Sequence, residues 1–401
     1  MIHIRNARIL TLSGGPRLRR GKEMSELGII PRGEVLVLDG KIAAVGPKVD
    51  APSEATSLDA AGRVLMPGLV DCHTHACYVA DRVEDWTLLA QGTTRAAVSQ
   101  KGGGGGAVMR SIQDATMKQL AAGLRERLSR MLREGTTTVE VKSGYGLNAA
   151  AELKMLRAIV RAGQDWPGTV VPTALLGHPV EGRNDEGDKA AAREMLHEIS
   201  QEFPEVAVDA WVDDGGWSID TALRLFEKAA KHHPIRVHSD EIKPLGMIAE
   251  AIRLHARSVD HLDAATKADL QALAAAPATC GVILPCASLN GSGRYARAGF
   301  IVDQGGAVAL GTDCNPVSSQ TLSMPFAIAL AVRFCGLSPA EAIVAATING
   351  AAVLGLKDRG TVEPGQRADL IILRHTDERQ LAFEWGGGAV ESVIAGGTMQ
   401  S

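Results

Sequence analysis

The chain has 401 residues, of which 45% are hydrophobic and 22% charged, so it can bury a large core in two or three domains or in one barrel with an attachment. Its formal net charge is −4 and its basic residues are scattered, which argues against a nucleic-acid-binding protein. Only 3% of the residues are aromatic, so the core must consist mainly of Ala, Leu, Val and Ile.

Apolar stretches are too short to indicate a membrane protein, because none reaches the roughly 18 residues of a spanning helix. The first residues lack the apolar core and cleavage site of a secretory signal. The six cysteines form no C-x-x-C pair, which favours reduced thiols. We therefore expect a cytoplasmic protein that binds neither nucleic acid nor membrane.

Both ends of the chain contain short β-like runs separated by Gly and Pro. Near the N-terminus the runs cover residues 2–4, 34–38 and 41–45, and near the C-terminus they cover 368–373 and 390–397. The pattern predicts one small β-sandwich domain built from residues 1–66 and 357–401.

Eight short apolar runs lie between these ends, and most precede a helix-like stretch. The runs cover residues 68–75, 137–142, 170–176, 206–212, 235–238, 258–262, 281–285 and 307–311. Helix-like stretches include 150–162, 220–231, 247–255 and 338–354, while the glycines of 102–106 indicate a linker or a mobile active-site loop. Eight β-then-α units predict an α/β protein with a (β/α)8 TIM-like barrel at residues 67–356.

Polar residues suited to binding a metal occur where several of these runs end. His73 and His75 are separated by one residue in a strand, so their side chains point the same way and form half of a metal site. His238, His261 and Asp313 follow three later runs. Barrel enzymes place their chemical groups at this end of the strands, which favours ligands over structural histidines.

These segments resemble the amidohydrolase superfamily, as do residues 364–370. The resemblance implies that His73, His75, His238 and Asp313 bind one divalent metal ion, either zinc or iron. The fourth run contains no lysine, which argues against a carboxylated lysine bridging two metals there. We interpret Lys142, in the second run, as a structural or loop-positioning residue.

Within the superfamily, residues 80–82, 102–105, 140–147, 177–178 and 312–316 resemble the imidazolonepropionases of histidine degradation. That resemblance implies that Glu241 and His261 handle the protons of the attacking water, and that Glu241 or Asp313 returns one to the leaving nitrogen. Substrate contacts are implied for the following residues: Arg82, Tyr145 and His178. The sequence does not identify the principal base.

The implied reaction is hydrolysis of a cyclic C–N bond, converting 4-imidazolone-5-propanoate to N-formimino-L-glutamate. A small substrate with a carboxylate suits Arg82, because guanidinium binds carboxylate through two hydrogen bonds. Three alternatives stay open: an amidohydrolase that opens a hydantoin- or thiohydantoin-type propionate ring, an aminohydrolase that deaminates a heterocycle, and a metal-free binding protein. The assembly state is open too, with a homodimer among the choices.

Overall fold

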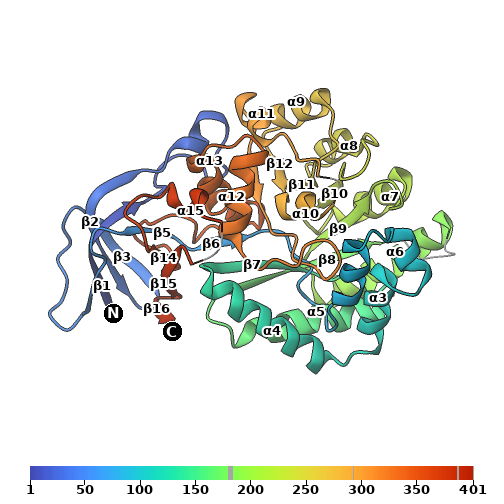
Figure 1. Ribbon diagram of the computed structural model, residues 1–401, viewed down its shortest axis with the longest axis horizontal. Coiled ribbons are helices and arrows are strands. Elements are labelled where there is room, and N and C mark those ends of the chain that lie inside the picture. Colours follow the sequence, from blue (N-terminus) through green and yellow to red (C-terminus); the bar gives the residue numbers. More distant parts are fainter. Residues whose placement is uncertain (179–183, 292, 386–387, 401) are drawn as a thin grey trace.

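The computed structural model describes residues 1–178, 184–291, 293–385 and 388–400, and it contains two sheets that lie side by side (Figure 1). The smaller, mixed sheet holds both chain ends, and the larger sheet is a nearly closed parallel barrel surrounded by helices. The predicted α/β fold, a TIM-like barrel with a β-domain from both termini, is confirmed.

The barrel strands follow one another in chain order around the sheet. They are β6 (Leu69–Asp71), β7 (Thr136–Lys142), β8 (Thr169–Gly177), β9 (Ala207–Val212), β10 (Arg236–Ser239), β11 (Ser258–His261), β12 (Cys280–Ile283) and β13 (Val308–Leu310). Each predicted run overlaps one of them. Just beyond β6 and β13, Thr74 pairs with Cys314 and the Asp313 amide donates to the His73 carbonyl at 3.0 Å, which brings the first and last strands together.

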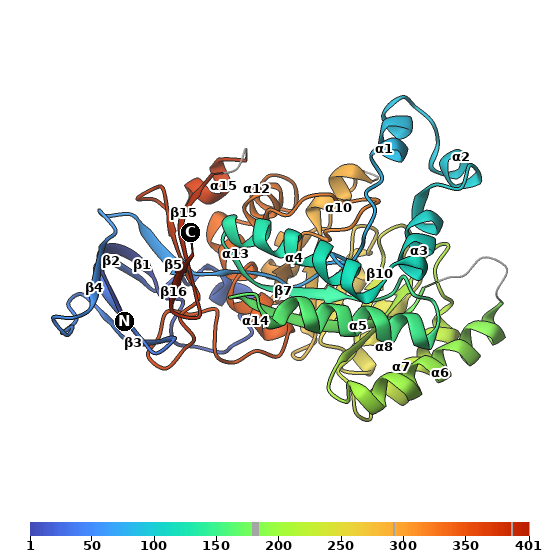
Figure 2. The ribbon, with the colours of Figure 1, turned by 90° about the horizontal axis from the view of Figure 1, so that it is seen from below.

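Helices connect these strands and cover the outside of the barrel (Figure 1). They are α1 (Val83–Ala90), α2 (Arg95–Gln100), α3 (Gly104–Asp114), α4 (Met117–Arg133), α5 (Ala149–Gln164), α6 (Asp185–Glu202), α7 (Ile219–Ala229), α8 (Met247–Arg253), α9 (Lys267–Ala275), α10 (Pro285–Asn290), α11 (Ala298–Asp303), α12 (Met324–Phe334), α13 (Pro339–Ala345) and α14 (Ile348–Val353). Figure 2 shows α1 and α2 projecting from the barrel.

Two local predictions differ from the structure. The stretch 338–354 is two helices rather than one, because Thr347 leaves the helical region at φ −132° and ψ −95° and its hydroxyl donates to the Ile343 carbonyl. Competition of this kind between a Thr side chain and the helix backbone is not visible in the apolar pattern. The glycine run 102–106 does lie in the first βα connection, but its last three residues begin helix α3.

The mixed sheet joins the two ends of the chain. Its members are β1 (Ile2–Leu10), β2 (Ile29–Leu38), β3 (Lys41–Gly46), β4 (Thr56–Asp59), β5 (Val64–Pro67), β14 (Leu370–Leu373), β15 (Val390–Ala395) and β16 (Thr398–Gln400), with the short helices η1 (Gly21–Ser25) and α15 (Gln380–Phe383) nearby. Strand β14 pairs antiparallel with β5, directly before the first barrel strand. The exact domain boundaries, 66/67 and 356/357, stay predictions.

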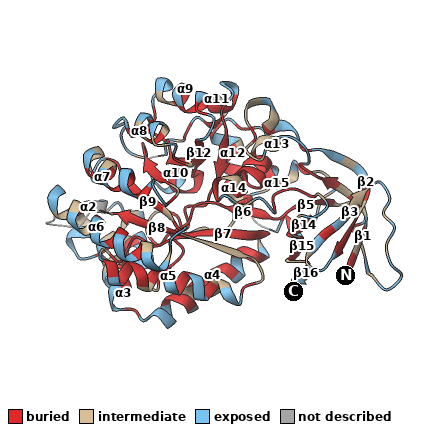
Figure 3. Ribbon diagram, turned by 180° about the vertical axis from the view of Figure 1, so that it is seen from behind, coloured by how far each residue is buried: buried red, intermediate tan, exposed pale blue. Residues whose placement is uncertain are grey.

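Burial follows this architecture (Figure 3). All seven residues of β7 are buried, polar ones included, because one face points into the barrel and the other packs against helices. Helix α4 is instead amphipathic and begins with a capping box of Thr116 and Gln119. Among the described residues, no helix combines the length and apolar character that crossing a bilayer requires.

Candidate metal centre and active site

Four of the predicted ligands lie together at the C-terminal end of the barrel. The Nε2 atoms of His75 and His238 are 3.2 Å apart, and Asp313 Oδ1 is 3.5 Å from the Nε2 atoms of both His73 and His75. All four side chains are buried. His261 joins the same cluster, because its ligating nitrogen, the ligating nitrogen of His73 and a carboxylate oxygen of Asp313 all lie within 4.8 Å of one another.

Two buried carboxylates orient two of the histidines. His73 Nδ1 is 2.6 Å from Asp260 Oδ2, and His238 Nδ1 is 3.0 Å from Asp209 Oδ1. An ionised carboxylate only accepts hydrogen bonds, so each Nδ1 carries the hydrogen and each Nε2 presents its lone pair to the cluster. Although burial opposes ionisation, His238 and Lys142 hold the pKa of Asp209 below its ordinary value.

Two buried cations complete this layer beneath the histidines. Lys142 Nζ donates to Glu140 at 2.7 Å and Asp209 at 2.9 Å, and Arg236 Nη2 donates to Asp260 at 2.7 Å. Burial and Arg236 oppose protonation of Lys142, but Asp209 and Glu140 raise the pKa of its ammonium group above the ordinary value. A charged lysine held by two carboxylates is not a carboxylated metal bridge, so its structural interpretation fits these contacts.

The residues present fit a divalent metal ion. Burial and the charges of Lys142 and His238 hold the pKa of His73 well below its ordinary value, so its imidazole is neutral, as a ligand must be. Its Nε2 is buried and has no hydrogen-bond partner among the described residues. Burial raises the pKa of Asp313 to about 8; the charge of His261 opposes this rise and the charge of Glu241 adds to it. A bound cation would instead favour the ionised carboxylate and lower this pKa.

Strained backbone places several of these groups. Asp240, His261 and Asp313 have positive φ angles of 60°, 85° and 54°. Such conformations cost about 1–3 kcal/mol each and persist where the surrounding structure holds them. All three lie at or just beyond the ends of strands β10, β11 and β13, where the chain turns sharply around the cluster.

Glu241 faces the cluster from the loop after β10. Its charge raises the pKa of both His261 and Asp313, although burial opposes the effect on His261. The loop is fixed by the carboxylate of Asp213, which accepts hydrogen bonds from the backbone amides of Glu241, Ile242 and Lys243 at 2.7–3.0 Å. Asp213 directly follows strand β9, and the apolar pattern of the sequence does not assign it this role.

Two predicted substrate contacts line the same site. The ring of Tyr145 lies 5.7 Å from that of His75 and 5.6 Å from that of His178. Burial and Asp313 raise the pKa of Tyr145, and burial lowers the pKa of His178 to about 4, so both side chains are neutral hydrogen-bond donors. His178 Nδ1 is buried with no partner in the described part of the chain, which leaves it available to a ligand.

A buried carboxylate holds the turn that carries Tyr145. Glu152 accepts hydrogen bonds from the backbone amides of Gly144, Gly146 and Leu147 at 2.7–3.0 Å. Gly144 has a φ of +111°, and a Cβ there would lie 2.7 Å from Leu175, so only glycine suits this position. Gly144 and Glu152 therefore fix the tight turn that carries Tyr145.

The third predicted contact, Arg82, lies farther out. Its Nε donates to Asp85 at 2.7 Å, and Asp85 also accepts the amide of Gly104. A cavity of about 220 Å³ beside it is lined by residues of α1, α2 and α3, and by Val317 from the loop after β13. The ion pair uses only Nε among the described contacts, so both terminal nitrogens of Arg82 are available.

Asp260 offers a test of the supporting layer. We expect Asp260→Asn to weaken metal binding by about 10–100-fold, because the amide cannot orient His73 as the carboxylate does. Competition with a chelator of known affinity measures this. The exposed Asp220→Asn variant on α7 is the control, and unchanged affinity in folded Asp260→Asn would contradict the role.

The chain is similar in sequence to a protein family and to named relatives, and similar in fold to solved structures. Residues 64–399 match the model of the Amidohydrolase family. The chain is 39% identical over 384 residues to a protein named imidazolonepropionase from Deinococcus radiodurans, and the match covers 95% of each chain. It is also 39% identical over 409 residues to a protein of the same name from Chloroflexus aggregans, and that match covers 97% of this chain and 95% of the relative. The fold is similar to zinc-complexed atrazine chlorohydrolase from Arthrobacter aurescens, with a TM-score of 0.74 and 18% identity over 100% of this chain and 95% of that chain.

Proposed function

Because this chain belongs to the imidazolonepropionase family of the amidohydrolases, we propose that it hydrolyses 4-imidazolone-5-propanoate to N-formimino-L-glutamate in histidine degradation. The observation that carries the proposal is the convergence of His73, His75, His238 and Asp313 in a chain matched by these relatives from end to end. The six cysteines are free and buried, which agrees with a cytoplasmic enzyme.

The four converging ligands would hold one divalent ion, and their N3O set suits zinc and iron alike. When bound, such an ion lowers the pKa of a water ligand from about 15.7 toward about 7 and polarises a carbonyl. Asp209 and Asp260 keep two of the imidazoles oriented toward the ion.

Glu241 accepts a proton from the attacking water in this proposal, because its charge acts on both His261 and Asp313 from the loop after β10. His261 donates a hydrogen bond to the oxygen of the ring carbonyl as negative charge develops there, since Glu241 and Asp313 favour its protonated form. Glu241 then passes the proton to the ring nitrogen as the C–N bond breaks. Water thus adds across that bond, and its second hydrogen stays on the new carboxyl group until it is released to solvent.

The remaining contacts orient the ring and its side chain. Tyr145 and His178 donate hydrogen bonds to the substrate beside the metal ligands. Arg82, held by Asp85, binds the propionate carboxylate at the mouth of the barrel. The partly exposed Arg125 on α4, which pairs with Asp165, offers a matched control for this assignment.

Arg82→Met should lower kcat/KM for the propionate-bearing substrate by about tenfold to more than a hundredfold, because a charge-assisted contact of about 1.5–3 kcal/mol is lost. Hydrolysis of a neutral ring analogue should change little. Steady-state kinetics of Arg82→Met beside Arg125→Met measure this. Equal losses on acidic and neutral rings would make Arg82 a structural residue.

Product analysis tests the reaction itself. Ring opening of 4-imidazolone-5-propanoate should yield N-formimino-L-glutamate without stoichiometric ammonia in the initial phase, as followed by mass spectrometry and an ammonia assay. Release of ammonia with the ring intact would instead identify a heterocycle aminohydrolase. Preference for a hydantoin-type ring would retain the metal chemistry but change the substrate.

A further inference from the structure

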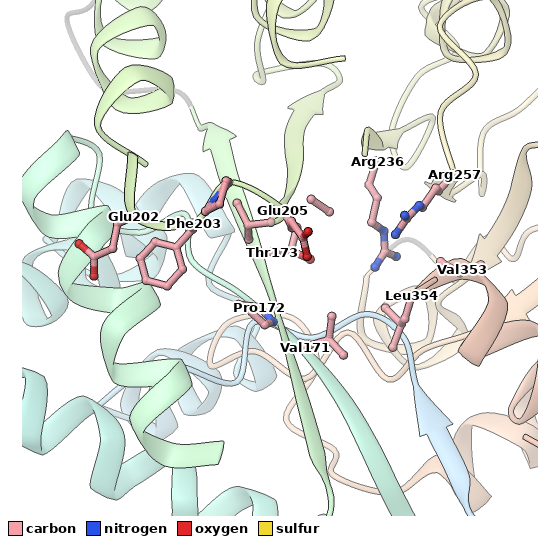
Figure 4. Close-up of a pocket in the computed structure, with 13 residues that line it drawn as sticks. Val171, Pro172, Thr173, Glu202, Phe203, Glu205, Arg236, Arg257, Val353 and Leu354 are labelled. Atoms are coloured by element: carbon pink, nitrogen blue, oxygen red, sulfur yellow. The ribbon is translucent and has the colours of Figure 1, made fainter. Parts of the chain in front are cut away.

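A second cavity lies at the opposite end of the barrel from the metal centre (Figure 4). Its volume is about 390 Å³. Ala207 and Arg236 are the first residues of β9 and β10, and Arg257 directly precedes β11, so this basal cavity lies where the strands begin. His238 and His261, in contrast, lie near the ends of β10 and β11.

Two guanidinium groups line the basal cavity, as Figure 4 shows. Arg257 is partly buried, and its side chain has no ion pair or hydrogen bond in the described part of the chain. Arg236 is buried; its Nη2 and Nε bind Asp260 and Ser258, whereas its Nη1 lies 3.3 Å from Glu140 Oε1 without forming a hydrogen bond. Burial and the charge of Arg236 lower the pKa of Arg257, so a bound anion would stabilise the Arg257 cation.

The other walls limit what kind of anion fits. Most of the lining is apolar and includes Val171, Phe203 and Leu354. One of the two acidic residues in the wall, Glu202, pairs with Arg157 at 2.6 Å. The other, Glu205, is exposed to solvent and forms no ion pair in the described regions.

We propose that the basal cavity binds a small organic carboxylate, with its charged group against the guanidinium of Arg257, beside Arg236, and its apolar body against Val171 and Leu354. A guanidinium binds a carboxylate through parallel hydrogen bonds, and the apolar walls favour an organic body over a bare inorganic ion. None of the proposed metal ligands or substrate contacts lines this cavity, so the site is separate from the proposed substrate site and does not depend on the proposed function.

Binding of 4-bromobenzoate to the metal-loaded full chain tests the proposal, with calorimetry for affinity and bromine anomalous scattering in soaked crystals for position. We expect a dissociation constant of about 1 mM and a bromine peak in the basal cavity. Arg257→Gln should weaken the affinity at least about tenfold, and Arg257→Lys, which keeps the charge and guards against a folding defect, should retain most of it. Arg236 is left unchanged because it also binds Asp260.

Arg253→Gln, an exposed arginine on α8 paired with Glu250 and Glu227, is the matched control and should bind as the unmodified chain does. Inorganic phosphate should bind at least about tenfold more weakly than 4-bromobenzoate, because it lacks an apolar body. Three results would each overturn the proposal. They are the absence of a bromine peak from the cavity, equal affinity of Arg257→Gln and the unmodified protein for 4-bromobenzoate, and phosphate binding as tight as that of 4-bromobenzoate.

Discussion

Replacing His73 by Ala should remove the metal ion and lower kcat by about 10³-fold or more, since metal activation of water contributes several kcal/mol. His73 is the most constrained ligand of the centre. It is fully buried, its Nδ1 is bound to Asp260, and its free Nε2 faces Asp313. Elemental analysis of the purified variant gives metal per chain, and steady-state kinetics give kcat.

The exposed His197 on α6 is the matched control, and His197→Ala should keep both metal and activity. Treating the unmodified protein with a chelator should abolish activity, and adding zinc or iron(II) should restore it. The same addition should not restore His73→Ala. Full turnover by a sample shown to be free of metal would refute the metal mechanism while leaving the fold assignment intact.

Periodicity carried the ligand prediction. The two-residue period of a strand was enough to place His73 and His75 on one side, and the position of a residue after an apolar run was enough to place His238, His261 and Asp313 at the same end of a barrel. In the structure these five side chains lie in two groups that share His73. The alternation of side chains along a strand and the position of a residue after an apolar run are local properties of the sequence, so they can be recognised without coordinates.

The supporting residues could not be found in this way. His73 and Asp260 are 187 positions apart on strands that are not neighbours in the sheet, and they meet only across the barrel interior. Their contact depends on strand register and side-chain length, which periodicity does not determine. An acidic residue inside a buried strand was the available signal, and it applies to Asp209 and Asp260.

Arg82 illustrates a second limit. Its position beside Glu84 and Asp85 fits a surface ion pair as well as a substrate contact, and the structure contains the ion pair with Asp85 while leaving the terminal nitrogens available. The two interpretations are therefore compatible, because Asp85 can orient the guanidinium for a carboxylate. Whether the substrate uses it depends on a ligand, so the kinetic comparison above decides it.

Glu241→Gln should lower kcat by about 10²-fold or more while the metal content stays normal, because the amide has the size of the carboxylate but cannot accept the proton of water. Asp213 binds the backbone of residues 241–243 rather than the Glu241 side chain, so the loop should keep its position in the variant. A change of KM within about threefold would agree with a role in chemistry rather than in binding.

Asp214→Asn is the matched control, since Asp214 is an exposed carboxylate beside this loop, paired with Lys243. It should leave kcat unchanged. Glu241→Asp keeps the basic group but shortens its reach, so its kcat should lie between those of Glu241→Gln and the unmodified enzyme. A normal kcat in metal-loaded Glu241→Gln would show that another residue is the general base. The next residue to replace would then be His261, because Glu241 and Asp313 raise its pKa although burial opposes this.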